Sequence, residues 1–244
     1  MRIKKNFTDF AKYYDLIYSW KDFKKESIVL DSLIKKHKKT KGKELLEVAC
    51  GSGKYIEFLK SKYKITGLDL SSRMLKIAKK NFPNVKYKKA DMINFNMKKE
   101  FDVILCLFAS ISYVKTYSKL SKTLKNFSKH LKPGGVVIID PWFTKSQYKV
   151  GAPQMAVYKG KDIKIARLHV SKIKGNVSIL DLHFSVAEKN KDVKNFREKH
   201  ELGMFEKKKF LQIMREAGFK PKFTEETEFI KAFGKTGLYV GIKK

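Results

Sequence analysis

Short apolar segments alternate with amphipathic ones between residues 44 and 139, and this alternation allows few architectures. Apolar runs with the length and composition of buried strands lie at 44–49, 65–70, 85–90, 101–108 and 136–139. Segments with helical spacing of their apolar residues lie between them, at 54–62, 72–81 and 117–131. Strands that alternate with helices in this way predict an α/β fold with a parallel sheet covered by helices on both faces.

The pattern changes after residue 143. Residues 154–202 contain three or four segments of period-two alternation, separated by turn signals, which predict an antiparallel sheet with one face toward the body of the protein. A helix is expected at 206–217, followed by two closing strands at 221–226 and 237–242. The sequence therefore divides into a helical N-terminal cap (1–41), a core (42–143), an antiparallel β insertion (144–203), and a C-terminal helix with a closing hairpin (204–244).

The turn after the first predicted strand has the sequence ACGSG at residues 49–53, as at the start of a nucleotide-cofactor site. A phosphate loop needs G-x-x-x-x-G-K-[ST], but Val48 stands at the first glycine position and Tyr55 follows Lys54. A dinucleotide turn needs a third glycine, and Ile56 occupies its place. Both phosphate-binding alternatives are therefore disfavoured.

Acidic residues stand at the carboxyl ends of the first three predicted strands: Glu47, Asp69 and Asp91. S-adenosylmethionine carries no phosphate and needs open backbone beside its methionine and ribose portions, which Gly51 and Gly53 supply. Asp69 is positioned to accept the ribose hydroxyls, as in nucleotide folds. Asp91 would accept the adenine amino group, and Glu47 the ammonium of the methionine portion. The three acids together predict S-adenosyl-L-methionine as the cofactor, with S-adenosyl-L-homocysteine as the product.

Ordered motifs resemble those of class I S-adenosylmethionine-dependent methyltransferases: LLEVACGSG, GLDLSSRML, ADM, FDVILCLFASISYV and LKPGGVVIIDPWF. The resemblance covers about residues 12–143 and implies a Rossmann-like, mostly parallel sheet whose last strand is antiparallel. The segments YYDLIYSWKDF, DPWF and GNVSILDLHFSVA are similar to bacterial enzymes that N,N-dimethylate nucleotide-linked amino sugars, of the desosamine and mycaminose type. In those enzymes an arginine stands in the last hairpin, whereas this chain has Thr236 there with Lys235 adjacent. That departure leaves the nucleotide part of the acceptor open, although lysine also binds phosphate.

The resemblance also implies roles for individual residues. Tyr14 and Tyr18 would cap the methionine end of the cofactor, while Met92 and Ile93 would flank the adenine. Further cofactor contacts are implied at Ala49, Leu70, Met74 and Leu107. The acceptor side is expected at Ser110, Tyr113, Trp142, Lys235 and Thr236.

Tyr113 is the candidate catalytic residue, at a position where the sugar enzymes have histidine or tyrosine. A neutral amine would attack the sulfonium methyl group in line with the departing thioether, so that the main task of the protein is positioning. A base helps only if the amine arrives protonated. We expect Tyr113 to orient the nucleophile; packing as a rim aromatic is an equally open reading. Trp142 would wall the acceptor pocket or act as a lid over the sheet edge, and His169 and His183 are read as packing or surface residues.

The charge balance is extreme, with 55 Lys+Arg against 24 Asp+Glu and a formal net charge of +31. Such an excess is typical of anionic partners such as RNA or a nucleotide-linked substrate. The lysines are scattered in pairs and triplets, however, without an arginine-rich arm or an RNA-binding aromatic motif, which favours solvated helix faces. We therefore expect a small-molecule acceptor, most simply an amine. An RNA (tRNA) methyltransferase, another small-molecule N- or O-methyltransferase and an idle cofactor-binding protein stay open as alternatives.

The location and assembly follow from weaker signals. The longest nearly uncharged apolar run, at 103–114, is too short to cross a bilayer, and the charged N-terminus lacks a signal-peptide core. Cys50 and Cys106 lie inside apolar segments, and the five histidines and two cysteines show no metal-site spacing. We expect a cytoplasmic protein without a metal or a membrane partner. A homodimer is implied by resemblance alone.

Overall fold

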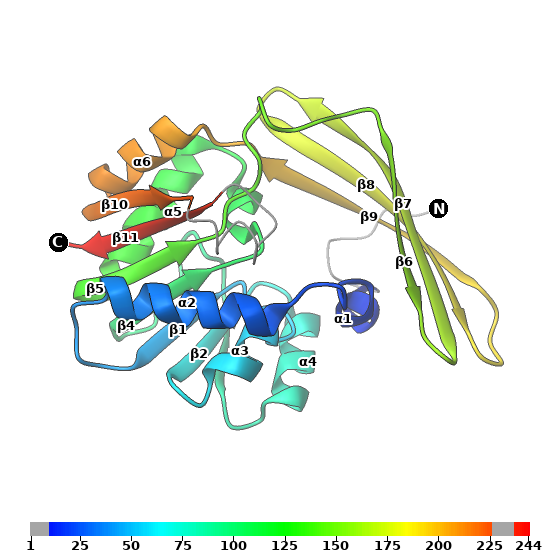
Figure 1. The fold of residues 1–244 in the computed structure, drawn as a ribbon, viewed down its shortest axis with the longest axis horizontal. Helices are drawn as coiled ribbons and strands as arrows, with labels where there is room; N and C mark the ends of the chain where they lie inside the picture. Colours follow the sequence, from blue (N-terminus) through cyan, green and yellow to red (C-terminus); the bar gives the residue numbers. More distant parts are fainter. Residues whose placement is uncertain (1–9, 226–236) are drawn as a thin grey trace.

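The computed structural model describes residues 10–225 and 237–244, and its centre is a seven-stranded sheet in the order β10-β11-β5-β4-β1-β2-β3 (Figure 1). Strands β1 to β5 are parallel, and β11 runs antiparallel to both β5 and β10. The strands are β1 Glu44–Val48, β2 Lys64–Asp69, β3 Lys86–Lys89, β4 Phe101–Cys106, β5 Leu131–Ile139, β10 Phe219–Thr224 and β11 Leu238–Lys243. The predicted α/β class, mostly parallel with a reversed last strand, is confirmed.

Helices cover both faces of this sheet because successive strand residues point to opposite sides. In β1, Leu45 belongs to the apolar cluster that α2, α3 and α4 complete, whereas Leu46 belongs to the cluster with α5 and α6. The helices are α2 Phe23–His37, α3 Lys54–Leu59, α4 Ser72–Asn81, α5 Tyr117–Lys129 and α6 Lys207–Glu216. Side-chain caps start α4 and α5, where Ser71 accepts from the backbone of Met74 and Thr116 from that of Lys119.

The structure adds detail to two local expectations. Within the described part of the predicted helical arm, a short 3-10 helix, η1 Phe10–Tyr13, leads into α1 Tyr14–Ile17, and α2 starts separately. The break has a local cause, since the Asp22 side chain accepts from Lys25 N at 2.8 Å and so caps a new helix. The LKPGG segment does end α5, but it already belongs to β5, which pairs at Leu131, shifts register and pairs again from Val136.

The predicted insertion is a separate antiparallel sheet of four strands in the order β6-β7-β8-β9. Its strands are β6 Pro153–Lys159, β7 Ile163–Lys174, β8 Val177–Glu188 and β9 Lys194–Gly203. Its inner face packs on η1 and α1 through an aromatic cluster in which Phe10 lies 4.3 Å from Phe184, centroid to centroid. The short helices η1 and α1 therefore lie between the two sheets (Figure 1). Within residues 10–225 and 237–244, no helix has the length and apolarity to cross a membrane.

Candidate active site

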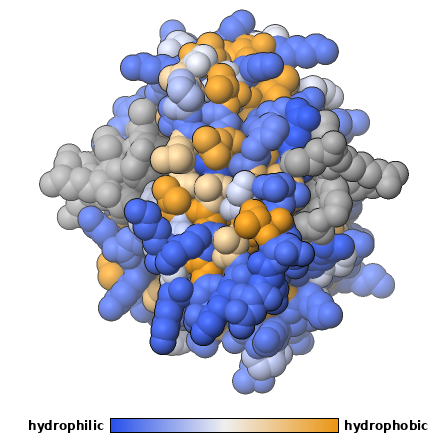
Figure 2. All heavy atoms as spheres, turned by 90° about the vertical axis from the view of Figure 1, so that its right-hand side faces the viewer, coloured by the Kyte–Doolittle hydropathy of each residue, from blue (hydrophilic) through white to orange (hydrophobic). Residues whose placement is uncertain are grey.

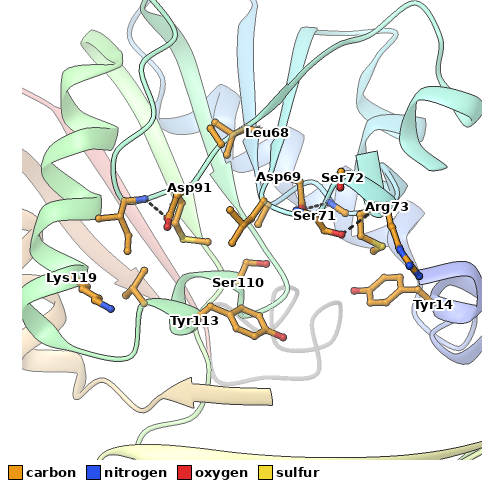
Figure 3. A pocket seen from close by; sticks show the side chains of 18 residues that line it. Tyr14, Leu68, Asp69, Ser71, Ser72, Arg73, Asp91, Ser110, Tyr113 and Lys119 are labelled. Atoms are coloured by element: carbon orange, nitrogen blue, oxygen red, sulfur yellow. Dashed lines mark hydrogen bonds between the residues drawn. The ribbon is translucent and has the colours of Figure 1, made fainter. Parts of the chain in front are cut away.

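A cavity of about 550 Å³ opens at the carboxyl ends of β1, β2 and β3, where a parallel α/β sheet places its ligands. Turns after these strands, the start of α4, Tyr14 of α1 and the 3-10 turn η2 Ser110–Val114 form its walls (Figure 3). Many of the residues singled out in the sequence line it: Tyr14, Ala49, Gly51, Asp69, Leu70, Met74, Asp91, Met92, Ile93, Ser110 and Tyr113. The cavity therefore joins the residues expected at the cofactor to two of those expected at the acceptor.

The turn after β1 is held by Asp69. One carboxylate oxygen of Asp69 accepts from Gly51 N at 2.8 Å, and the other accepts from Ser71 N at 2.7 Å. Gly51 has a φ of +55°, and a Cβ built on it would lie 3.3 Å from the Met74 methyl group, so a larger residue would narrow the cavity. Each carboxylate oxygen keeps lone-pair capacity for a ligand hydroxyl, because it can accept more than one hydrogen bond.

Gly53 serves a different purpose from Gly51. It caps α3 with a φ of +87° and does not line the cavity. A Cβ there would meet the Phe82 ring at 3.0 Å, so the glycine allows α3 to pack against the end of α4. The structure thus does not bring Gly53 to the cofactor cavity, where the sequence had suggested it.

Glu47 lies behind the turn rather than on the cavity wall. Its side chain is buried within β1, between Gly67 of β2 and Leu105 of β4. Desolvation, with a further contribution from the Asp69 charge, raises the pKa of Glu47 to about 8. The carboxyl is therefore largely protonated at neutral pH, and a nearby ligand cation would favour its ionised form.

Other predicted residues also lie away from the cavity. Leu107 is buried in the core cluster on the α2 face. Tyr18 packs on Tyr14 and Phe108, and its hydroxyl accepts from Arg167 Nη1 at 3.0 Å. Trp142 donates from Nε1 to Ser178 Oγ at 2.9 Å and so ties the segment after β5 to the insertion sheet. Lys235 and Thr236 lie outside the described residues.

Several residues of the site escaped sequence reasoning. Arg73 of α4 and Lys119 of α5 add positive charge to the cavity wall. On the acceptor side, Tyr113 Oη lies 2.6 Å from Nδ1 of His200, whose Nε2 is 3.4 Å from Oε2 of Glu198. The signal for the last two residues was present: in the strand 194–203, Phe196 and Leu202 mark the inner face by alternation, and Glu198 and His200 share their parity.

Comparisons with known proteins agree with this site. A family model described as a methyltransferase domain matches residues 45–135. The chain is 30% identical to a dTDP-3-amino-3,4,6-trideoxy-alpha-D-glucopyranose N,N-dimethyltransferase of Streptomyces venezuelae, over 96% of this chain and 98% of the relative. It is 31% identical to a dTDP-4-amino-2,3,4,6-tetradeoxy-D-glucose N,N-dimethyltransferase of Saccharopolyspora spinosa, over 96% and 93%.

Solved structures extend the likeness to the whole fold. DesVI of Streptomyces venezuelae superposes with a TM-score of 0.89 at 29% identity, covering 97% of this chain and 99% of that chain. The sugar N-methyltransferase KedS8 from a Streptoalloteichus strain gives a TM-score of 0.84 at 28% identity, covering 95% and 92%. The four-stranded insertion is therefore part of the shared architecture.

The sheet with its reversed last strand and the cavity with its carboxylates define a class I S-adenosylmethionine-dependent methyltransferase. S-adenosylmethionine is the cofactor of this class, as the sequence had predicted. Within the class, the chain belongs to the family of the sugar N,N-dimethyltransferases, because relatives with at least 30% identity span nearly its whole length.

Proposed function

We propose that this protein transfers methyl groups from S-adenosylmethionine to the amine nitrogen of a nucleotide-linked amino sugar. The observation that carries the proposal is one cavity with Asp69 and Asp91 at one part of its wall and the hydroxyl-bearing Tyr14 and Tyr113 at another (Figure 3). The named relatives act on dTDP-linked amino sugars, and their identity extends over the insertion as well as the core.

The residues of the cavity suit S-adenosylmethionine. Asp69 and Asp91 offer carboxylate oxygens to ribose hydroxyls and the adenine amine. Asp69 already accepts from Gly51 N and Ser71 N, and Asp91 from Ile93 N, but carboxylate oxygens can accept further hydrogen bonds. Met92 and Ile93 supply apolar surface beside them. The Glu47 carboxyl would act on the methionine ammonium through a water molecule, because it lies behind the wall.

Bound S-adenosylmethionine supplies a methyl group on a sulfonium, whose departure as a neutral thioether needs no acid. The protein must therefore hold the amine in line with that methyl group and keep its lone pair free. Ser110 and Tyr113 follow β4 and contribute the acceptor end of the cavity. Trp142, Lys235 and Thr236 stay predictions for the acceptor side. In the same proposal, residues 42–143 form the cofactor core and residues 144–203 the acceptor-side sheet.

The acceptor is tested by methyl transfer with product mass spectrometry. Purified protein is incubated with S-adenosylmethionine and, separately, dTDP-linked 3-amino and 4-amino sugars, the corresponding free amino sugars, simple amines and bulk tRNA. We expect a gain of two methyl groups on a dTDP-linked sugar, with slower reaction of the free sugar because the anionic dTDP group adds binding. Labelling of tRNA alone would contradict the proposal.

We also propose that two copies of the chain associate through the outer face of the insertion sheet. Large apolar side chains of β6 and β7 are exposed there, namely Met155 (68%), Val157 (50%), Leu168 (48%) and Val170 (43%). Figure 2 views this end of the molecule and shows hydrophobic atoms running through the middle of a largely hydrophilic surface. A contiguous apolar patch on a charged protein is typical of an association surface.

A cytoplasmic location completes the proposal and is compatible with two buried free cysteines.

A further inference from the structure

Two polar side chains lie on the inner face of β9, at positions where the alternating pattern of the strand predicts apolar residues. Phe196, Glu198, His200 and Leu202 share this face, and Glu198 and His200 are only 1% and 6% exposed. Burying a carboxylate and an imidazole costs free energy unless they are paired or hydrogen-bonded. Such a pair therefore needs partners, and its contacts indicate what it can do.

The contacts form a chain that leads out of the active-site cavity. Tyr113 lines the cavity, and Figure 3 shows its ring beside that of Tyr14, with the two hydroxyls directed toward the space between them. The Tyr113 hydroxyl is 2.6 Å from His200 Nδ1, and the far ring nitrogen of His200 is 3.4 Å from Glu198 Oε2. The second distance is an electrostatic contact rather than a hydrogen bond, and it becomes an ion pair once the imidazole takes up a proton.

The environment of Tyr113 keeps its hydroxyl protonated. Desolvation, then the charges of Tyr18 and Glu198, raises the pKa of Tyr113 well above its ordinary value. The hydroxyl therefore keeps its proton and can donate it to His200 Nδ1, which is the direction that a proton relay requires. In that arrangement the imidazole N–H lies on Nε2, the nitrogen that faces Glu198. A tyrosine oxygen that donates one hydrogen bond can also accept one, and Tyr113 lines the cavity where the acceptor would lie.

An amine acceptor needs a group in the cavity that takes up its proton. An alkyl amine is mostly an ammonium ion at neutral pH, and only the neutral form has the lone pair that attacks the methyl group. Each methyl transfer to nitrogen also leaves an extra proton on the product, so two transfers require two proton removals. Neither the departing thioether nor the carboxylates beside the cofactor take up that proton in the proposed reaction.

We propose that Tyr113, His200 and Glu198 form a proton relay that deprotonates the acceptor ammonium before each methyl transfer. The inference rests on the proposed function. The ammonium N–H proton passes to the Tyr113 oxygen while the hydroxyl proton of Tyr113 passes to His200 Nδ1, and Glu198 stabilises the imidazolium. The amine lone pair then forms the N–C bond as the C–S bond breaks, and that bond's electron pair stays on sulfur. Before the next transfer the imidazolium proton returns from Nδ1 through the Tyr113 hydroxyl to water in the cavity, because His200 Nε2 is buried.

The test compares variants that separate proton uptake from positioning. His200→Asn keeps an oxygen that accepts the Tyr113 hydrogen bond but cannot take up a proton. With a dTDP-linked amino sugar that the wild type methylates, we expect kcat to fall by about 10²-fold or more, while KM and S-adenosylmethionine affinity stay within a few-fold. Glu198→Gln should lower kcat by about 10-fold, because the imidazolium loses its adjacent charge. His183→Asn, on the outer face of β8, is the matched control and should behave as the wild type.

A second acceptor makes the comparison decisive. The N-hydroxylated analogue of the same sugar has a nitrogen that is unprotonated at neutral pH, so the relay is not needed. We expect the rate ratio between wild type and each variant to approach one with this analogue. A wild-type rate for His200→Asn on the ordinary amine, or an equal loss on both acceptors, would overturn the relay. If His200→Asn does not fold, the same comparison with Glu198→Gln decides. Failure of the wild type to methylate any sugar amine would instead refute the proposed function.

Discussion

At the scale of single residues, the cofactor site contains carboxyl groups whose burial lowers the stability of the ligand-free fold. Glu47 is buried without a cationic partner among the described residues, and its pKa of about 8 measures the free energy of keeping it ionised there. A ligand that brings an ammonium group offsets part of this cost. The same carboxyl therefore favours the cofactor complex and disfavours the ligand-free fold, and the two effects can be separated.

Replacing Glu47 with glutamine should make the ligand-free protein less sensitive to pH. The folded carboxyl holds a proton up to about pH 8, whereas in an unfolded chain it releases the proton near pH 4.3. The folded state therefore binds more protons across this window, and Glu47 lowers the free energy of unfolding as pH rises through it. We expect the advantage of Glu47→Gln over wild type to grow by roughly 3 kcal/mol between pH 5 and pH 8.

Urea unfolding at several pH values measures this advantage, and calorimetry measures the opposing effect on binding. We expect S-adenosylmethionine to bind the glutamine variant about 10-fold more weakly, because a charge-assisted interaction is lost. The affinity of the wild type for S-adenosylmethionine should rise with pH toward 8. At higher pH Glu47 is already ionised in more of the free protein, so binding no longer has to remove its proton. Parallel pH profiles of stability for the two proteins would show that Glu47 is not the titrating group.

Asp69 carries a second prediction at this scale. In Asp69→Asn an amide NH2 replaces one of the two oxygens that accept from Gly51 N and Ser71 N. One backbone donor then faces another donor, so both the turn and its contact with the ribose weaken. We expect S-adenosylmethionine affinity to fall at least about 10-fold, measured by calorimetry. Asp192→Asn, at an exposed position of the β8–β9 loop, should leave the affinity unchanged. If both variants bind S-adenosylmethionine with equal affinity, Asp69 does not contact the cofactor.

At the scale of elements, periodicity predicted most of the core sheet and its helices, because burial on one or both faces imposes it directly. Boundaries set by local hydrogen bonds were harder to read: the Asp22 cap splits the N-terminal arm, and a register shift lets β5 begin at Leu131. The glycine turn was recognised as a unit, but the sequence cannot separate a glycine that opens the cavity, Gly51, from one that admits a helix contact, Gly53. Glu198 and His200 were missed because their partner, Tyr113, lies 85 or more residues away.

Gly53→Ala tests whether Gly53 is needed for the contact of α3 with Phe82, separately from the role of Gly51 beside the cavity. The substitution places a Cβ at a φ of +87° and 3.0 Å from the Phe82 ring. Gly175→Ala, in the β7–β8 turn at a φ of +59°, meets nothing within 4 Å and reports the backbone strain alone. We expect the control to lose about 1 kcal/mol of stability and Gly53→Ala about 1–3 kcal/mol more. Thermal unfolding measures both. Equal losses in the two variants would mean that α3 does not depend on the close approach of Phe82.

At the scale of the whole molecule, the two sheets differ in what their outer surfaces require. The seven-stranded sheet is covered on both faces by its helices, whereas the insertion sheet packs only its inner face, on η1 and α1. The outer face of the insertion sheet is apolar along β6 and β7. Along β8 and β9 it carries paired charges instead, such as Arg197, which donates two hydrogen bonds to Asp181. A surface of this kind suits pairing with a copy of itself about a two-fold axis, since each apolar half then covers the other.

The double variant Met155→Glu with Leu168→Glu tests this assembly. The two side chains are cross-strand partners in the β6–β7 register, so the variant places a pair of like charges in the middle of the apolar patch. We expect light scattering behind size-exclusion chromatography to give the mass of a dimer for the wild type and of a monomer for the variant. Val193→Glu adds one carboxylate at an exposed valine of the β8–β9 loop, outside the patch, and should remain dimeric. A wild type that is monomeric at micromolar concentration, or a variant that still dimerises, would exclude this face as the interface. Because the substituted face points away from the cavity, the monomeric variant should retain S-adenosylmethionine binding, and its loss would mean instead that dimerisation supports the cofactor site through the packing of α1 on this sheet.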